Sequence, residues 1–494
     1  MKNSILTLCL GAASIGAIIT PHAATAAALP APIGLISATP ADLVSTPAGA
    51  HGFVRVDPQT QRLVFEDGTP ATFYTVNYAT FLNDPKRVIP TEEMVEVLTG
   101  MKALGVNAIR CQVADNRMQQ GVFGQGINEV ALENRDRFIA EGKKLGIYFH
   151  MCLSLASAGK GGATELFRKA GGSREMMIII DDFIDYQRTF TTNLLNHVNP
   201  YTGLAYKDEP AIISLQLGNE QHAYSRHHWQ NWTRHTGPYA AEIKTRWNTF
   251  LANKYTDRAG IAKAWGSALL DGEDPVKGTV AINDVVFPTW KDKFIPNQRQ
   301  QDIILFADAM QRRFHDIMRK TIREEVGDTK HLISDNGWIR GDRLIRQTAH
   351  EKLDLLDLQH YWPHGERGRQ TAEKLMNVSP IRDCGVNIIA SMLTAREFDG
   401  VKKPAFITEY NSHKDNLRLP QFVPVHTVLA MLTGIDGVAL WAYGSHKADD
   451  FFNQDHWFGF NRDTSDLERE LTPFVVGSYL WRTSIPELID SDRI

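Results

Sequence analysis

The chain has 494 residues, of which 43% are hydrophobic and 22% charged, with a formal net charge of −4 at pH 7. This length and apolar content are enough for one large core of the size of an α/β barrel. The slightly acidic balance excludes the basic footprint by which nucleic-acid-binding proteins are recognised, so we expect no nucleic-acid partner.

The first residues have the pattern of a secretory signal peptide. Lys2 supplies a positive start, residues 5–20 are apolar or small, and residues 22–28 offer small-residue cleavage sites. The apolar stretch is short for a membrane span, and no other run of about 18 apolar residues follows. We therefore expect residues 1–28 to be a signal peptide, residues 29–50 to be an Ala/Pro-rich linker, and the protein to be secreted or periplasmic.

Cysteine usage indicates neither a disulfide framework nor a metal site. Cys9 would leave with the signal peptide, so Cys111, Cys152 and Cys384 remain, an odd number. Cys111 and Cys152 fall at predicted strand ends, where small buried hydrophobes are the expected role. No CxxC, HxH, GxGxxG or Walker spacing is present, and we expect no metal and no cofactor.

Strands and helices alternate along most of the chain. A small hairpin around the turn Asp67-Gly68 is expected to feed the first strand, and Thr91 is expected to cap the first helix. Gly105 and Gly146 should end the first two helices. The predicted strands are residues 73–77, 105–113, 147–155, 212–220, 331–336, 353–361, 405–409 and 437–443. The predicted helices are residues 91–104, 129–145, 181–198, 241–255, 260–265, 302–326 and 468–480.

Eight strands separated by helices or long connections predict a (β/α)8 TIM barrel over residues 51–494. Several strands are apolar throughout, as strands buried on both faces are. A long insertion, residues 221–300, follows the fourth strand. The alternative is an open doubly wound sheet, which would normally carry a phosphate-binding glycine loop after its first strand, and the sequence has none.

Polar residues stand at the carboxyl ends of the predicted strands, where the active site of a TIM barrel lies. Two of them, Glu220 and Glu409, each end an apolar strand, and a pair of carboxylates facing one cleft can cut a glycosidic bond. The full set is Asn77, Tyr78, Arg110, Gln112, Cys152, Ser154, Asn219, Glu220, Asn336, Trp338, His360, Tyr361, Trp362, Glu409 and Trp441.

On these residues the chain resembles the clan A glycoside hydrolases, most closely the family 5 cellulases and mannanases. Asn219-Glu220 is similar to the Asn–Glu signature after strand 4, and Glu409 to the nucleophile after strand 7. The segment 105–110, ending in Arg110, is similar to the family 5 motif on strand 2, and Trp441 to the aromatic floor. Two pieces of the insertion, residues 246–255 and 262–266, resemble the strand-4 insertion of clan A β-galactosidases.

The resemblance implies a secreted, retaining hydrolase that cuts β-linked plant-type or algal poly- or oligosaccharides by double displacement. Glu409 would be the nucleophile, supported by Arg110, and Glu220 the acid/base. Asn219, Arg110, His360, Tyr361, Trp441 and Asn77 would bind substrate or support the catalytic pair. The chain departs from family 5 on strand 3, where Ser154 takes the place of a histidine and His150 lies earlier. On strand 6 it has His360-Tyr361-Trp362 instead of His-x-Tyr.

Three alternatives stay open at this point. The barrel could bind carbohydrate without cutting it, or it could be a metal-dependent hydrolase, for which His360 and His364 would be candidate ligands. Trp232 could be a core residue or a sugar platform. Endoglucanase-like and β-mannanase-like activities, and galactosides as substrates, all remain compatible with the sequence, as do endo and exo action and any oligomeric state.

Overall fold

The computed structural model describes residues 46–78, 86–112, 119–120, 126–153, 175–220, 223, 232–282, 297–336, 343–361, 392–393, 396–411, 419–441, 477–478 and 481. The predicted signal peptide, nearly all of the predicted linker and most of the expected last helix lie outside these residues. Among the helices that are described, none is both long enough and apolar enough to cross a membrane.

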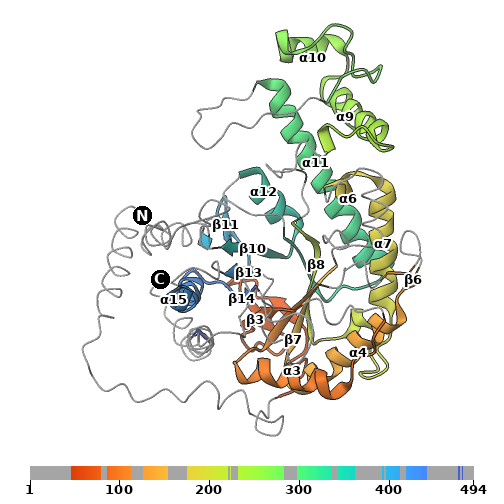
Figure 1. The fold of residues 1–494 in the computed structure, drawn as a ribbon. Coiled ribbons are helices and arrows are strands. Elements are labelled where there is room, and N and C mark those ends of the chain that lie inside the picture. Colours follow the sequence, from red (N-terminus) through yellow and green to blue (C-terminus); the bar gives the residue numbers. More distant parts are fainter. Residues whose placement is uncertain are drawn as a thin grey trace, which may run out of the picture.

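Eight parallel strands form a closed barrel, which confirms the predicted fold class (Figure 1). Around the barrel each strand pairs with the next one in chain order, and the last strand, β14, pairs with β3. The barrel strands are β3 (Phe73–Asn77), β4 (Ala108–Gln112), β7 (Tyr148–Cys152), β8 (Ile212–Asn219), β9 (Leu332–Asn336), β10 (Leu355–Tyr361), β13 (Ala405–Asn411) and β14 (Gly437–Leu440).

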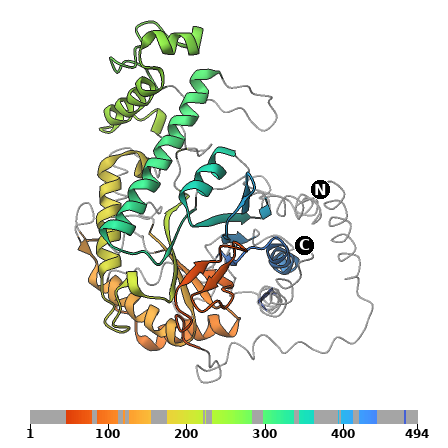
Figure 2. The ribbon, with the colours of Figure 1, turned by 180° about the vertical axis from the view of Figure 1, so that it is seen from behind.

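Helices pack around the outside of the barrel (Figures 1 and 2). They are α3 (Thr91–Ala103), α4 (Glu129–Lys144), α6 (Met176–Ile179), α7 (Asp181–Asn196), α11 (Gln298–Lys320), α12 (Arg343–Lys352) and α15 (Leu419–Leu432). Gly105 and Gly146 follow α3 and α4 with φ values of 86° and 68°, left-handed conformations that glycine adopts without steric cost. Both predicted helix ends are therefore confirmed.

The start of α3 differs from the sequence-based expectation. Thr91 is the first helical residue, and the capping position belongs to Pro90, which makes no side-chain hydrogen bond to the helix. Proline has no side-chain acceptor to offer the free N–H groups of the first turn. The acidic residues Glu92 and Glu93 in that turn complement the helix dipole instead.

The amino-terminal hairpin around the Asp67-Gly68 turn is confirmed: Phe65 N donates to Thr69 O at 2.8 Å, and Val64 forms an antiparallel bridge with Pro70. β1 (Val54–Val56) and β2 (Leu63–Phe65) are antiparallel partners, with Val54 opposite Phe65. The strand after the Asp67-Gly68 turn, β3, belongs to the barrel and pairs with β14 and β4. The hairpin thus leads into the first barrel strand, as the sequence predicted.

The insertion after β8 forms an arm that stands away from the barrel next to the first half of α11 (Figures 1 and 2). It contains α9 (Ala240–Tyr255), α10 (Arg258–Trp265) and a short 3-10 turn, Gly266–Ala268. Trp247 stacks on Phe250 and Trp265, with ring centroids 6.0 and 6.2 Å apart. Phe306 of α11 packs edge-on against Trp247 at 5.4 Å. The arm therefore has an aromatic core of its own, anchored on a barrel helix.

A buried ion pair ties the arm to the beginning of α11. Arg299 makes bidentate bonds to Glu273, at 2.7 and 2.8 Å, and both side chains are nearly inaccessible to solvent. The carboxylate also accepts the backbone N–H groups of Leu270 and Ala281, each at 2.9 Å. Although burial alone would raise the pKa of Glu273, these bonds hold it below its usual value.

Candidate active site

The barrel register brings the predicted site residues to one end of the barrel. Asn77 pairs with Arg110 across β3 and β4, and Asn219 pairs with Asn336 across β8 and β9. On β13, Glu409 lies beside β10. Each of these residues is at or near the carboxyl end of its strand, so the end used by TIM-barrel active sites is also the polar end here.

Arg110 is the centre of the site. Its side chain is fully buried and donates four hydrogen bonds to side chains on three other strands, β3, β8 and β13. Nε donates to Gln216 Oε1 at 2.8 Å, Nη1 to Asn77 Oδ1 at 2.7 Å and to Glu409 Oε1 at 2.9 Å, and Nη2 to Asn219 Oδ1 at 2.7 Å. A guanidinium has five N–H donors in one plane, so this geometry fixes its position almost completely.

Glu409 is held as the partner of this guanidinium. It is 4% exposed, and its carboxylate meets Arg110 where no water can screen the pair. Burial alone would lower the pKa of Arg110, but the nearby carboxylates of Glu409 and Asp357 raise it. The positive charge is therefore permanent and favours the ionised form of the carboxylate beside it.

Asn77 also helps to hold the guanidinium of Arg110 in place. Its amide nitrogen donates to the backbone oxygens of Thr408, at 2.8 Å, and Leu440, at 3.2 Å. Its carbonyl oxygen is thereby turned toward Arg110. Asn77 thus ties β3 to β13 and β14, and its position indicates support of the site rather than contact with a substrate.

Glu220 directly follows Asn219 at the end of β8, with a left-handed backbone, φ 57°. Its N–H donates to Asn336 O on the neighbouring strand at 2.9 Å. A left-handed glutamate is uncommon, and such conformations concentrate at functional sites. Because Asn219 and Glu409 both bind Arg110, the residue after Asn219 lies close to the same cluster.

Below Arg110 lies a second polar layer inside the barrel, which the sequence analysis did not assign to the site. Gln216 Oε1 accepts from Arg110 and lies 3.1 Å from His150 Nε2. That nitrogen is also 3.4 Å from Asp357 Oδ2, which accepts from Ser334 at 2.7 Å. All five side chains are buried. His150, expected only as a strand residue, thus supports the amide that holds the arginine.

One sequence signal could have revealed this layer. In the apolar run IISLQLGN, the polar residues Ser214 and Gln216 are two positions apart, so they share one face of the strand. His150 Nδ1 lies 2.5 Å from Ser214 Oγ, which shows that this face points into the barrel. Polar residues at every second position of a buried strand therefore indicated a polar barrel interior.

The remaining predicted site residues are placed only in part. His360 is buried in β10, with its ring 5.9 Å from that of His426, which stacks on Tyr410 at 4.4 Å. Burial, and then the nearby His360, lowers the pKa of His426 well below its usual value. Trp441 is partly buried directly after β14, and its backbone N–H donates to Tyr410 O at 3.1 Å.

Several candidates have side chains outside the described part of the chain: Tyr361, Gln112, Ser154, Trp338 and Trp362. Trp232, in contrast, is fully buried and donates to Ala223 O at 3.2 Å, so it is a core residue and not a sugar platform. Cys111 and Cys152 are buried free thiols. Within the residues that are described, no group of three or more His, Cys, Asp or Glu could hold a metal ion.

Comparison with known proteins places this site in a family. The model of the family Glyco_hydro_42, described as Beta-galactosidase, matches residues 167–448. That range contains both Glu220 and Glu409, as well as the whole insertion.

Among curated proteins, "Mannan endo-1,4-beta-mannosidase 4" of Oryza sativa subsp. japonica is 31% identical over 128 residues, 24% of this chain and 28% of the relative. The chain spans only 21% to 53% of the lengths of the curated relatives that it matches.

Two solved structures illustrate the likeness in fold. The endo-β-1,4-mannanase from Thermotoga petrophila has a TM-score of 0.54 at 15% identity, covering 85% of this chain and 78% of that one. The β-galactosidase from Marinomonas ef1 has a TM-score of 0.57 at 12% identity, covering 85% and 62%. Together with the family match, the barrel and its site show that the chain belongs to the clan A glycoside hydrolase family whose model is described as Beta-galactosidase.

Proposed function

We propose that the protein is a retaining glycoside hydrolase that cuts β-linked oligo- or polysaccharides by double displacement. The observation that carries this proposal is the buried guanidinium of Arg110, which binds both Glu409 and Asn219. It joins the end of one predicted catalytic strand to the end of the other. A barrel that only bound carbohydrate would not need a carboxylate buried against a permanent cation.

The roles of the two glutamates follow from their surroundings. Glu409, ionised against Arg110, attacks the anomeric carbon and forms the glycosyl–enzyme intermediate. Glu220 directly follows β8 and is half-buried, partly open to solvent. It protonates the leaving oxygen and then deprotonates the attacking water. Asn219, oriented by Arg110, donates its amide N–H to the 2-hydroxyl group. We expect the carboxyl groups to lie about 5–5.5 Å apart, as in retaining enzymes.

For the substrate, β-1,4-linked mannan is our first candidate, supported by the names of the curated relatives. A β-galactoside is the second, supported by the matched family model, which includes the insertion. The arm follows β8, so it begins on the catalytic end of the barrel, where loops select the substrate. A protruding arm beside the cleft can bind sugar units beyond the cleaved bond.

A substrate panel tests the proposal directly. Mannan, β-1,4-mannooligosaccharides, cellulose, lactose and aryl β-galactosides would be incubated with the wild-type protein and with Glu409→Gln, and the products resolved by size. We expect mannan fragments from the wild type and none from the variant, and NMR should show the β-anomer first. Hydrolysis of the galactosides alone would favour the second candidate, and initial α-anomer would contradict retention.

A mechanism-based fluorosugar separates an enzyme from a carbohydrate-binding barrel. We expect a 2-fluoro-glycoside of the preferred sugar to label Glu409 covalently, with peptide mass spectrometry locating the adduct. Carbohydrate binding without label or turnover would indicate a non-catalytic barrel. Loss of turnover in a chelator, restored by a divalent metal, would indicate the metal-dependent alternative instead.

We also propose that residues 1–28 direct export and that the hydrolase domain starts near residue 51. The composition of the first residues supports this, with Lys2 before an apolar stretch and small residues at 22–28. Amino-terminal sequencing of the protein recovered from periplasm or medium should show a start between residues 25 and 29. An intact Met1 on cell-internal protein would contradict export.

A further inference from the structure

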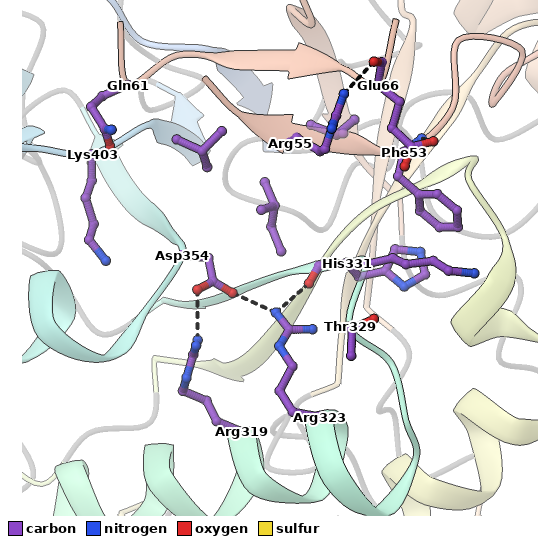
Figure 3. Close-up of a pocket in the computed structure, with 14 residues that line it drawn as sticks. Phe53, Arg55, Gln61, Glu66, Arg319, Arg323, Thr329, His331, Asp354 and Lys403 are labelled. Carbon is purple, nitrogen blue, oxygen red and sulfur yellow. Dashed lines mark hydrogen bonds and ion pairs between the residues drawn. The ribbon is translucent and has the colours of Figure 1, made fainter. Parts of the chain in front are cut away.

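A hollow of about 500 Å³ lies at the end of the barrel opposite to the catalytic glutamates (Figure 3). Its walls come from the hairpin β1–β2, from the last turn of α11 and the residues after it, and from residues at the start of barrel strands. Lys330 and His331 lead into β9, Asp354 immediately precedes β10, and Lys403 precedes β13. Glu220 and Glu409 stand at the other ends of their strands, so the hollow is separate from the active site.

The charges that line the hollow are unbalanced. Arg55, Arg319, Arg323, Lys330 and Lys403 contribute five cations, whereas Glu66 and Asp354 are the only carboxylates among the lining residues. Of these cations, Lys330 is neutralised from outside the hollow, because it lies 3.0 Å from Asp208. On the hairpin, Arg55 donates to the backbone oxygen of Glu66, whose carboxylate accepts the backbone N–H of Phe53.

Three of the lining cations are grouped around one carboxylate, that of Asp354. Arg319 and Arg323 both reach Asp354, at 3.1 and 2.8 Å, from the same side of the hollow (Figure 3). Lys403 approaches from another wall and donates to the backbone oxygen of Leu353. A further carboxylate, Asp328, lies 4.0 Å from Arg323, but it is already paired with His331 at 2.7 Å.

Arg319 and Arg323 differ in how many of their N–H groups are already bonded within the protein. Arg323 also donates to the backbone oxygens of Asp328 and His331, each at 2.7 Å, so its bonds hold the wall together. Arg319 uses only Nη1 among the described contacts, which leaves Nε and Nη2 able to donate to a ligand. Its side chain is 29% exposed. The hollow thus contains one guanidinium, that of Arg319, which is already oriented and still has N–H groups that can donate to a ligand.

Lys403 is unfavourably placed without an anion. Burial lowers its pKa, and the neighbouring Arg319 lowers it further, while Asp354 opposes the shift. An ammonium group in partly desolvated surroundings beside a guanidinium gains free energy from any dianion that contacts both groups. Thr329, exposed on the same wall, adds a hydroxyl donor.

We propose that this hollow is a binding site for a tetrahedral oxyanion, a phosphate or sulfate group, held by Arg319 and Lys403. A guanidinium fork and an ammonium point charge are the two side chains that bind such groups most strongly. The volume exceeds that of a free ion and is in the range of small-ligand pockets, so the group can be part of an ester. Because the site is at the opposite end of the barrel, its occupancy is independent of the glycosidase reaction.

Calorimetric titration with inorganic phosphate at pH 7 and constant ionic strength tests the proposal. We expect one phosphate per chain, and binding weakened about tenfold or more in Arg319→Gln and in Lys403→Gln. Arg188→Gln is the matched control, because Arg188 pairs with Asp185 and Glu325 and does not line the hollow. It should bind phosphate as the wild type does, and all variants should keep wild-type hydrolase turnover.

Parallel titrations with sulfate and with phenyl phosphate identify the form of the ligand, since an ester site should prefer phenyl phosphate to free phosphate. Lys403 also bonds to the backbone, so Lys403→Arg serves as a second variant that keeps the charge and should retain binding. The proposal would be overturned if none of the three anions bound. It would also be overturned if Arg319→Gln bound phosphate with the same affinity as the wild type.

Discussion

Arg110 Nη1 and Glu409 Oε1 lie 2.9 Å apart although 299 positions separate the two residues in the chain. The contact crosses the inside of the barrel from β4 to β13, with both side chains almost completely buried. An isolated carboxylate at this depth would be neutralised by protonation. The guanidinium keeps it charged, and this is what a nucleophile needs.

Removal of either catalytic glutamate should have a distinct effect that depends on the leaving group. Glu220→Ala should slow hydrolysis of natural glycosides by about 10²–10⁴-fold but affect dinitrophenyl glycosides much less in the first step, because that leaving group needs no protonation. Glu409→Ala should abolish turnover of both substrates. Steady-state kinetics on the two substrate types measures the difference. Glu397→Gln, on the exposed strand β11 (Glu397–Phe398), should behave as wild type. Equal losses on both substrates in Glu220→Ala would contradict the acid/base role.

Gln216 should act on catalysis through Arg110. In Gln216→Met the buried Nε of Arg110 loses its acceptor, so the guanidinium can shift away from Glu409. We expect kcat to fall by up to about 10²-fold with KM changed little. The matched control is Gln187→Met, also a fully buried amide, which donates to Leu217 O at 2.6 Å away from Arg110. If both variants lose stability equally and neither changes kcat, Gln216 has only a structural role.

The arm should depend on the buried pair of Arg299 and Glu273. Arg299→Leu leaves the carboxylate buried without its cation, which should destabilise the arm by about 3 kcal/mol. Limited proteolysis should then cut first within residues 240–282, and the urea midpoint should fall. Lys277→Leu is the control, because Lys277 is 76% exposed and 3.8 Å from Asp274, and it should change stability very little. Unchanged proteolysis in Arg299→Leu would show that the aromatic core alone holds the arm.

Asp328 should make stability depend on pH. Burial would raise its pKa, but hydrogen bonds from His331 and from two backbone N–H groups lower it below the ordinary value of 3.8. A lowered folded-state pKa means that the stabilisation is complete above 3.8 and is lost as the pH falls through the folded-state value.

Asp328→Asn should therefore lower the urea midpoint at pH 7, by the equivalent of about 1–3 kcal/mol, and the difference from wild type should shrink at pH 3. Asp316→Asn is the control, since Asp316 is 57% exposed and its pair with Lys352 contributes little. A wild-type-to-variant difference that is the same at both pH values would refute the linkage.

The sequence predicted the eight barrel strands because each is a local property. Apolar runs and glycine stops depend on neighbours in the chain, and the ends of α3 and α4 at Gly105 and Gly146 are confirmed. The hairpin around Asp67-Gly68 is also a local feature and is present, with Val64 bridged to Pro70. The pairing of β3 with β14, in contrast, depends on the closing of the barrel.

The two carboxylates and Arg110 of the candidate site could be predicted from the sequence, because the carboxyl ends of the strands meet at one end of a barrel. The sequence could not show that Arg110 also binds Gln216, and through it His150 and Asp357, because those residues lie on three other strands. Nor could the sequence decide whether Trp232 lies in the core or in the cleft. In the structure Trp232 packs against Phe306 of α11, which places it in the core.

The sequence by itself therefore determined the strands, most of the helices and the barrel, because periodicity and strand ends depend on residues that are neighbours in the chain. Only the tertiary structure decided which partner each buried polar group has. The physical reason is that a buried charge such as that of Glu409 persists only beside a partner, and the partner comes from a distant strand that the closed barrel brings to 2.9 Å.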